Sequence, residues 1–102
     1  MITIKKLNNL MYDVSIAIFG TKKIEFENEE LAKMIKEDVL SYFWSMDKMN
    51  IAIDIEEISD ERTNKKVYLL RCEALLVFND GRDDDANTIG NYISNSFLNK
   101  LE

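Results

Sequence analysis

Residues 67–78 read VYLLRCEALLVF, a long stretch in which two kinds of side chain alternate. Every second side chain from Tyr68 to Phe78 is apolar, whereas the intervening series carries Arg71 and Glu73 in its middle. Because successive side chains point to opposite faces of a strand, this pattern predicts a strand with one face in the core.

The preceding stretch, NIAIDIEEIS at residues 50–59, alternates in the same way until its phase slips at Glu57 and Ile58. The slip predicts either a bulge or the end of the strand. A polar loop over residues 60–66 joins the two stretches, which predicts an antiparallel hairpin. Across that hairpin we expect charged pairs, formed by Arg71 and Glu73 with Asp54 and Glu56.

Three upstream segments are also strand candidates. Tyr12–Phe19 alternates well, with Tyr12, Val14, Ile16 and Ile18 on one face. A turn at residues 20–22 leads to a short expected strand at Lys23–Glu27. Residues 1–7 alternate weakly, so we interpret them as an edge strand or a frayed arm.

Residues 29–49 show the periodicity of an amphipathic helix. Asn28 is the expected N-cap, and Glu29 and Glu30 suit the first turn of a helix. We expect this helix to run to about Asp47, with an apolar stripe made by Leu31, Ile35, Val39, Tyr42 and Met46.

A second helix is expected after a turn at residues 79–81. Asp83 would cap it, with Asp84 and Asp85 in its first turn, and its buried stripe would be Ala86, Ile89, Ile93, Phe97 and Leu101. Gly90 falls within this stripe, which predicts a close approach to the sheet or to the other helix.

The element order is therefore β-β-α-β-β-α within one domain over residues 1–102. We predict an α+β fold, an antiparallel sheet of about four strands with two helices on one face.

Composition excludes several kinds of chemistry. The chain of 102 residues has no histidine, one cysteine and a net charge of −6. Without histidine it lacks the commonest general base and transition-metal ligand, and the acidic charge argues against binding nucleic acid or anionic membranes. Cys72 lies on the apolar strand face, which predicts a buried, inert thiol.

The acidic run at residues 80–85 lacks the ligand spacing of a calcium loop, so we expect no metal and no cofactor. No signal sequence and no long apolar run are present, and we expect a cytoplasmic protein.

Leu40 and Trp44 stand apart from the expected core. In the expected helix they lie one turn apart, opposite the apolar stripe, and their neighbours on that face are charged: Lys33, Lys36, Glu37 and Asp47. An apolar pair on a solvated face, including the single tryptophan of the chain, predicts a docking surface for another protein. The alternative is a helix that is covered on both faces, within the domain or in a homodimer.

We therefore interpret the chain as a small acidic, non-enzymatic module that binds or inhibits another protein. The abundance of Asn, Lys and Ile is typical of AT-rich genomes and indicates a low-GC bacterium or its phage, and we expect a module encoded by a phage or mobile element. The first alternative is a nucleic-acid mimic that blocks a basic partner through an acidic surface, formed by Asp54, Glu56, Glu57, Asp60, Glu61, Asp80, Asp83, Asp84 and Asp85. The second alternative is a carboxylate-dependent enzyme.

Overall fold

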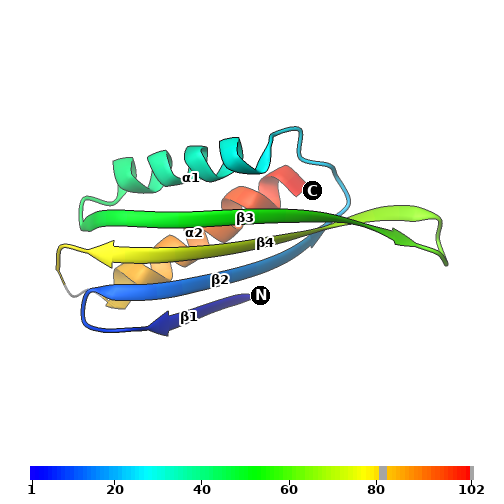
Figure 1. Cartoon of the computed structure of the whole chain (residues 1–102). Helices are drawn as coiled ribbons and strands as arrows, with labels where there is room; N and C mark the ends of the chain where they lie inside the picture. Colours follow the sequence, from blue (N-terminus) through cyan, green and yellow to red (C-terminus); the bar gives the residue numbers. More distant parts are fainter. Residues whose placement is uncertain (81–82, 102) are drawn as a thin grey trace.

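The computed structural model describes residues 1–80 and 83–101, and the side chain of Asp83 lies outside this description. Its elements follow the predicted order (Figure 1): β1 (Ile2–Lys6), β2 (Met11–Gly20), α1 (Asn28–Tyr42), β3 (Met46–Asp60), β4 (Lys65–Phe78) and α2 (Asp83–Leu101). The four strands form one antiparallel sheet in the order β1-β2-β4-β3. The predicted α+β fold is therefore confirmed.

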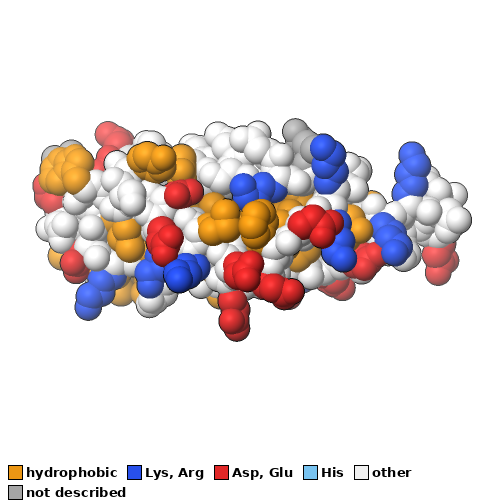
Figure 2. Space-filling view, turned by 90° about the horizontal axis from the view of Figure 1, so that it is seen from above, with side chains coloured by type: hydrophobic (Ala, Val, Ile, Leu, Met, Phe, Trp, Pro, Cys, Tyr) orange, Lys and Arg blue, Asp and Glu red, His pale blue; other side chains and the backbone are white. Residues whose placement is uncertain are grey.

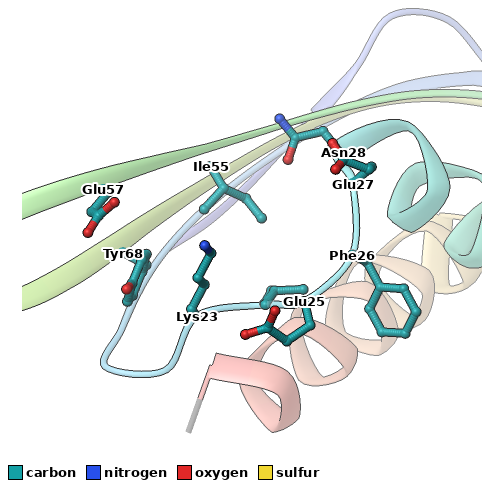
Figure 3. A pocket seen from close by; sticks show the side chains of 9 residues that line it. Lys23, Glu25, Phe26, Glu27, Asn28, Ile55, Glu57 and Tyr68 are labelled. Atoms are coloured by element: carbon teal, nitrogen blue, oxygen red, sulfur yellow. The ribbon is translucent and has the colours of Figure 1, made fainter.

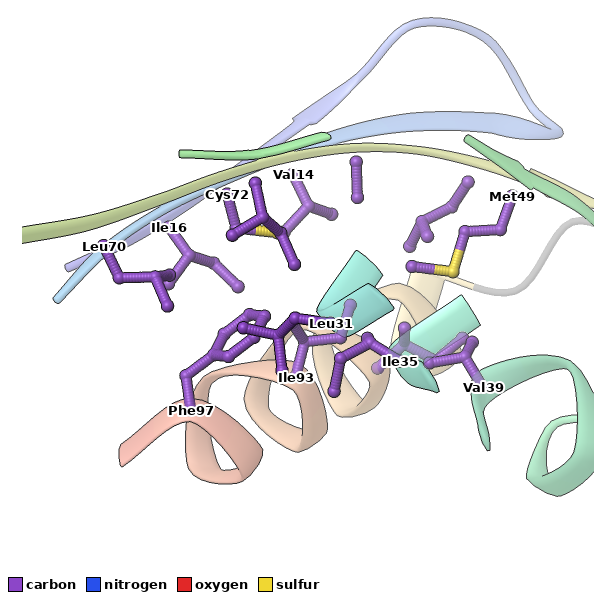
Figure 4. Close-up of a cluster of buried hydrophobic side chains, with 14 of the residues drawn as sticks. Val14, Ile16, Leu31, Ile35, Val39, Met49, Leu70, Cys72, Ile93 and Phe97 are labelled. Carbon is purple, nitrogen blue, oxygen red and sulfur yellow. The ribbon is translucent and has the colours of Figure 1, made fainter. Parts of the chain in front are cut away.

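The core lies between the sheet and the two helices. Cys72 of β4 pairs with Ile16 of β2 on one side and with Ile53 of β3 on the other, and all three side chains are buried. Side chains of α1 and α2 meet them from the same face of the sheet (Figure 4), and together they form one continuous buried cluster. Because one face of each strand must be apolar for this packing, the alternation in the sequence predicts it well.

The β3–β4 hairpin is the longest part of the molecule and projects beyond the other strands (Figure 1). Neither the bulge nor the strand end predicted at Glu57 and Ile58 is present, since β3 continues to Asp60 and its pairing register is continuous from Lys48 to Asp60. The apolar alternation stops there because β2 ends opposite Tyr68, so the hairpin beyond this point has no core to face. The single irregularity of this pairing lies at the other end of β3, between Met46 and Lys48, where Asp47 is the extra residue.

Residues 23–27 do not form the predicted strand. This segment belongs to the loop between β2 and α1, in which Ile24 is buried and its neighbours are exposed. The N-cap of α1 is Glu27 and not Asn28, which is already the first helical residue. The short alternation of this segment reflects one buried side chain, that of Ile24, and no strand pairing.

The first helix is shorter than predicted. It ends at Tyr42, and Phe43 is its C-cap, whose backbone N–H donates to the carbonyl of Val39 at 3.0 Å. Leu31, Ile35 and Val39 are buried as expected, whereas Tyr42 is 69% exposed. Met46 is buried, but as the first residue of β3 and not as part of a helical stripe.

The buried stripe of the second helix matches its prediction, whereas Asp83, the expected cap, is already the first residue of the helix. All five residues of its expected stripe, Ala86, Ile89, Ile93, Phe97 and Leu101, are fully buried. Gly90 lies against β1, where an added Cβ would come within 3.0 Å of Ile4 Cδ1, so the close approach to the sheet is confirmed. None of the helices in the described residues is both long and apolar enough to cross a membrane.

Candidate functional site

The turn that joins α1 to β3 presents two large aromatic side chains to solvent. Tyr42 is 69% exposed and Trp44 is 73% exposed, and Phe43 between them is half-buried. We call residues Tyr42, Phe43 and Trp44 the aromatic turn. Figure 2 shows hydrophobic side chains beside acidic ones at this end of the molecule, at left.

The aromatic turn is held by a ring from the other helix. Tyr92 of α2 contacts both Tyr42 and Phe43 edge to face, with ring centroids 5.9 Å apart in each pair. Edge-to-face pairs of this kind contribute about 0.5–1.5 kcal/mol beyond the area that they bury. Burial raises the pKa of the Tyr92 phenol, and the nearby charge of Asp38 raises it further, so this ring stays neutral near pH 7.

Hydrogen bonds fix the backbone of the same turn. The Met46 N–H donates to the Phe43 carbonyl at 3.0 Å, and the Asn79 N–H donates to the Ser45 carbonyl at 2.8 Å. Ser45 is 2% exposed, and its hydroxyl donates to an Asp85 carboxylate oxygen at 2.8 Å. Because Asn79, directly after β4, and Asp85 of α2 both hold Ser45, the backbone of the turn has a fixed position against the rest of the fold.

The structure brings together only part of the predicted docking surface. Leu40, 37% exposed, lies on the outer face of α1 in register with three exposed charged residues of that face: Lys33, Lys36 and Glu37. Trp44 is exposed as expected, but it lies beyond the end of α1, so its predicted spacing of one helical turn from Leu40 is wrong. Asp47 is exposed at the start of β3.

Four residues of this site are missed by reasoning from sequence. The helical stripe places Tyr42 in the core, and it gives no role to Phe43, Ser45 or Tyr92. The run of three aromatic residues at 42–44 was the available signal, since one apolar stripe cannot bury three consecutive side chains of a helix.

The predicted acidic surface is spread along the length of the molecule. Asp60 and Glu61 lie at the hairpin tip, whereas Asp54, which pairs with Arg71 in the middle of β4, and Glu56 lie on the sheet face away from the helices. Asp80, Asp84 and Asp85 lie at the end opposite the hairpin tip, and the Asp83 side chain is not described. The 14 residues of β4 separate the hairpin tip from that end by about 45 Å at about 3.3 Å per residue, so the acidic residues form no single surface in the described structure.

Several of these carboxylates already have partners. Glu56 forms the expected pair with Arg71 across the hairpin at 3.5 Å, and Glu57 pairs with Lys66 at 3.0 Å. Glu73 does not meet β3 charges as predicted, because it accepts a hydrogen bond from Ser15 of β2 at 2.8 Å.

A pocket of about 310 Å³ lies where the hairpin leaves the body of the molecule, beside the loop before α1 (Figure 3). Lys23, Glu25 and Glu57 line it together with Tyr68 and Ile55. Its lining therefore mixes both signs of charge.

Two observations concern reactive and metal-binding side chains among the described residues. Cys72 is fully buried, and burial raises the pKa of its thiol to about 12, so the reactive thiolate is disfavoured. Among the described residues no group of three His, Cys, Asp or Glu side chains is placed to hold a metal ion.

Comparison with protein-family models, with curated proteins and with solved structures finds no match. The site itself is an exposed aromatic surface on a turn whose backbone is held by hydrogen bonds.

Proposed function

We propose that this chain is a non-enzymatic module that binds another protein through the aromatic turn. The observation that carries the proposal is the exposure of Tyr42 and Trp44 on a turn that is fixed by Tyr92 and Ser45. Exposed Trp and Tyr side chains are enriched among the residues that dominate binding energy at protein interfaces. Binding would be inhibitory where the covered surface of the partner is its own functional site.

The size of the molecule is compatible with such an interface. A standard interface buries about 800 Å² on each partner, which is about one-eighth of the 6640 Å² surface of this chain. A patch of that size centred on the aromatic turn would include Leu40 and Asp47 at its rim. The rigid support of the turn favours binding, because fewer side chains must be ordered on contact.

The proposal is tested by photo-crosslinking from two positions. The photoreactive residue p-benzoylphenylalanine replaces Tyr42 in one variant and Arg62, at the hairpin tip, in the other. In lysate of the source organism, the variant at position 42 should crosslink one protein, and the variant at position 62 should not. After purification of that protein, Trp44→Ala should weaken its binding by about 30-fold or more, the factor for a loss of 2 kcal/mol.

The outcomes separate the alternatives. Crosslinks formed from position 62 and not from position 42 would contradict the proposal and favour mimicry of nucleic acid by the acidic hairpin. Crosslinking of position 42 to a second copy of this chain would show a homodimer instead of a complex with another protein.

A further inference from the structure

The aromatic turn lies in a concentration of negative charge. Among the side chains that the structure describes, five exposed or half-buried carboxylates belong to the segments that meet there: Asp38, Asp47, Asp80, Asp84 and Asp85. They come from α1, β3, the turn after β4 and α2, so the fold and not one run of sequence gathers them.

Hydrogen bonds hold the segments that carry three of these carboxylates against the turn. Asp85 accepts the hydrogen bond from Ser45, which follows Trp44 directly, and Asp84 precedes it in the first turn of α2. Asp80 follows Asn79, whose N–H donates to the Ser45 carbonyl.

Two further carboxylates lie close to the turn along the chain. Asp38 lies one helical turn before Tyr42, and its charge acts on the Tyr92 ring that supports Tyr42. Asp47 is the extra residue of the irregularity in β3 and is exposed three positions after Trp44.

The C-terminal end of α1 adds partial negative charge to the same surface. Unpaired carbonyl groups give the C-terminus of a helix a partial negative charge, which basic side chains in the last turn commonly offset. The last turn of α1 contains no basic residue. Lys36 lies one turn earlier on the outer face, and Lys48 lies on the sheet face away from the helices.

We propose that the partner presents an arginine or lysine side chain to the exposed rings of Tyr42 and Trp44, so that the aromatic turn recognises a basic protein segment. Cations are attracted to the faces of tryptophan and tyrosine rings, and surrounding carboxylates strengthen that attraction. An anionic partner such as nucleic acid would meet like charge at this surface. The inference rests on the proposed function, because it names the chemistry of the partner at the same site.

The first test uses Trp44 fluorescence, because Trp44 is the single tryptophan of the chain. Quenching by cationic caesium, anionic iodide and neutral acrylamide is compared with quenching of free N-acetyltryptophanamide. Caesium should quench Trp44 at least about twofold better than iodide after this normalisation. The variant Asp47→Asn/Asp84→Asn should reduce the ratio, and the matched control Asp60→Asn/Glu61→Gln at the hairpin tip should leave it unchanged.

The second test uses defined peptides as probes. The peptide acetyl-Gly-Arg-Gly-Arg-Gly-amide should change Trp44 fluorescence in a saturable way, at least about tenfold more tightly than the same peptide with citrulline in place of arginine. Trp44 must remain as the reporter, so Tyr42→Ala serves as the binding variant and should weaken the arginine peptide. Equal binding of the citrulline peptide, or equal quenching by caesium and iodide, would overturn the inference.

These outcomes differ from failure of the proposed function. If position 42 crosslinks a protein but the crosslinked segment is acidic or uncharged, the basic-partner inference is wrong while the docking function stands. If position 42 crosslinks nothing, the docking function itself fails.

Discussion

Replacement of Gly20 by alanine should lower the free energy of unfolding by about 2–4 kcal/mol. Gly20 ends β2 with an ordinary negative φ, so it is needed for space and not for its backbone conformation. An added Cβ would overlap the Cβ of Leu101 and would lie 2.9 Å from the Leu101 carbonyl oxygen. That carbonyl also accepts hydrogen bonds from the Thr21 and Lys22 N–H groups, at 3.2 and 3.0 Å.

The magnitude follows from these contacts. Overpacking of a filled site usually costs about 1–3 kcal/mol, and each lost hydrogen bond adds about 0.5–1.5 kcal/mol. Leu101 cannot easily move away from the added Cβ. One obstructing group is its backbone carbonyl, and the other is its side chain, which is fully buried.

Gly90→Ala is the matched control. Its added Cβ would meet Ile4 Cδ1, the mobile end of a side chain, at 3.0 Å. Alanine also gains about 1 kcal/mol of helix propensity over glycine, so this variant should stay within about 1 kcal/mol of the parent.

Urea unfolding followed by circular dichroism at 222 nm measures both variants, because Trp44 is too exposed to report on the core. A loss below about 1 kcal/mol for Gly20→Ala would show that the last turn of α2 simply moves aside. That result would refute the claim that this helix end is locked to the loop after β2.

Three further predictions concern the core and the turn. The folded-state pKa of Cys72, about 12, lies above the ordinary 9.0. Burial of the neutral thiol therefore stabilises the folded state below pH 9, and this stabilisation is lost as the pH rises toward 12. In urea titrations, the free energy of unfolding of the parent should fall by about 1.4 kcal/mol more between pH 8 and pH 10 than that of Cys72→Ala. An equal dependence on pH in the two proteins would contradict this. Ser45→Ala should lower the free energy of unfolding by about 1–3 kcal/mol, since a half-buried carboxylate loses its donor; an unchanged melting temperature would show that backbone contacts hold the turn by themselves. Leu40→Ala with Trp44→Ala should cost less than about 2 kcal/mol in unfolding experiments, against about 3–5 kcal/mol for Phe97→Ala, and equal losses would place the pair in the core.

The elements that could be predicted from the sequence are those in which a single physical cause explains the pattern of apolar residues. Cys72 and its strand alternate because a core covers one face and solvent the other. The stripe from Ala86 to Leu101 recurs at helical spacing because one continuous face meets the sheet.

The end of α1 could not be predicted, because two different structures give the same pattern. Met46 is buried at helical spacing from Tyr42, yet it reaches the core from β3 after the chain has turned back. Neither glycine nor proline marks the turn, and the contacts that fix it come from Asn79, Asp85 and Tyr92, far along the chain.

The residues of the site could also be predicted only in part. Exposure of Leu40 and Trp44 could be predicted from the charged residues around them. The gathering of Asp80 and Asp85 beside Trp44 could not, because it depends on how β4 and α2 close against the first helix.

The contacts that support the aromatic turn come from distant parts of the chain, so the proposed binding site depends on complete folding. Ser45 and Asp85 are 40 positions apart in the chain, so the turn gains its final shape only when the last helix has docked. Contacts of such sequence separation form late, because a long loop must close before they contribute. A partner that binds the proposed site would therefore select the native chain over partly folded forms. By mass action such binding would also raise the apparent stability of the folded chain, by about 2.7 kcal/mol when the free partner is at 100 times its Kd.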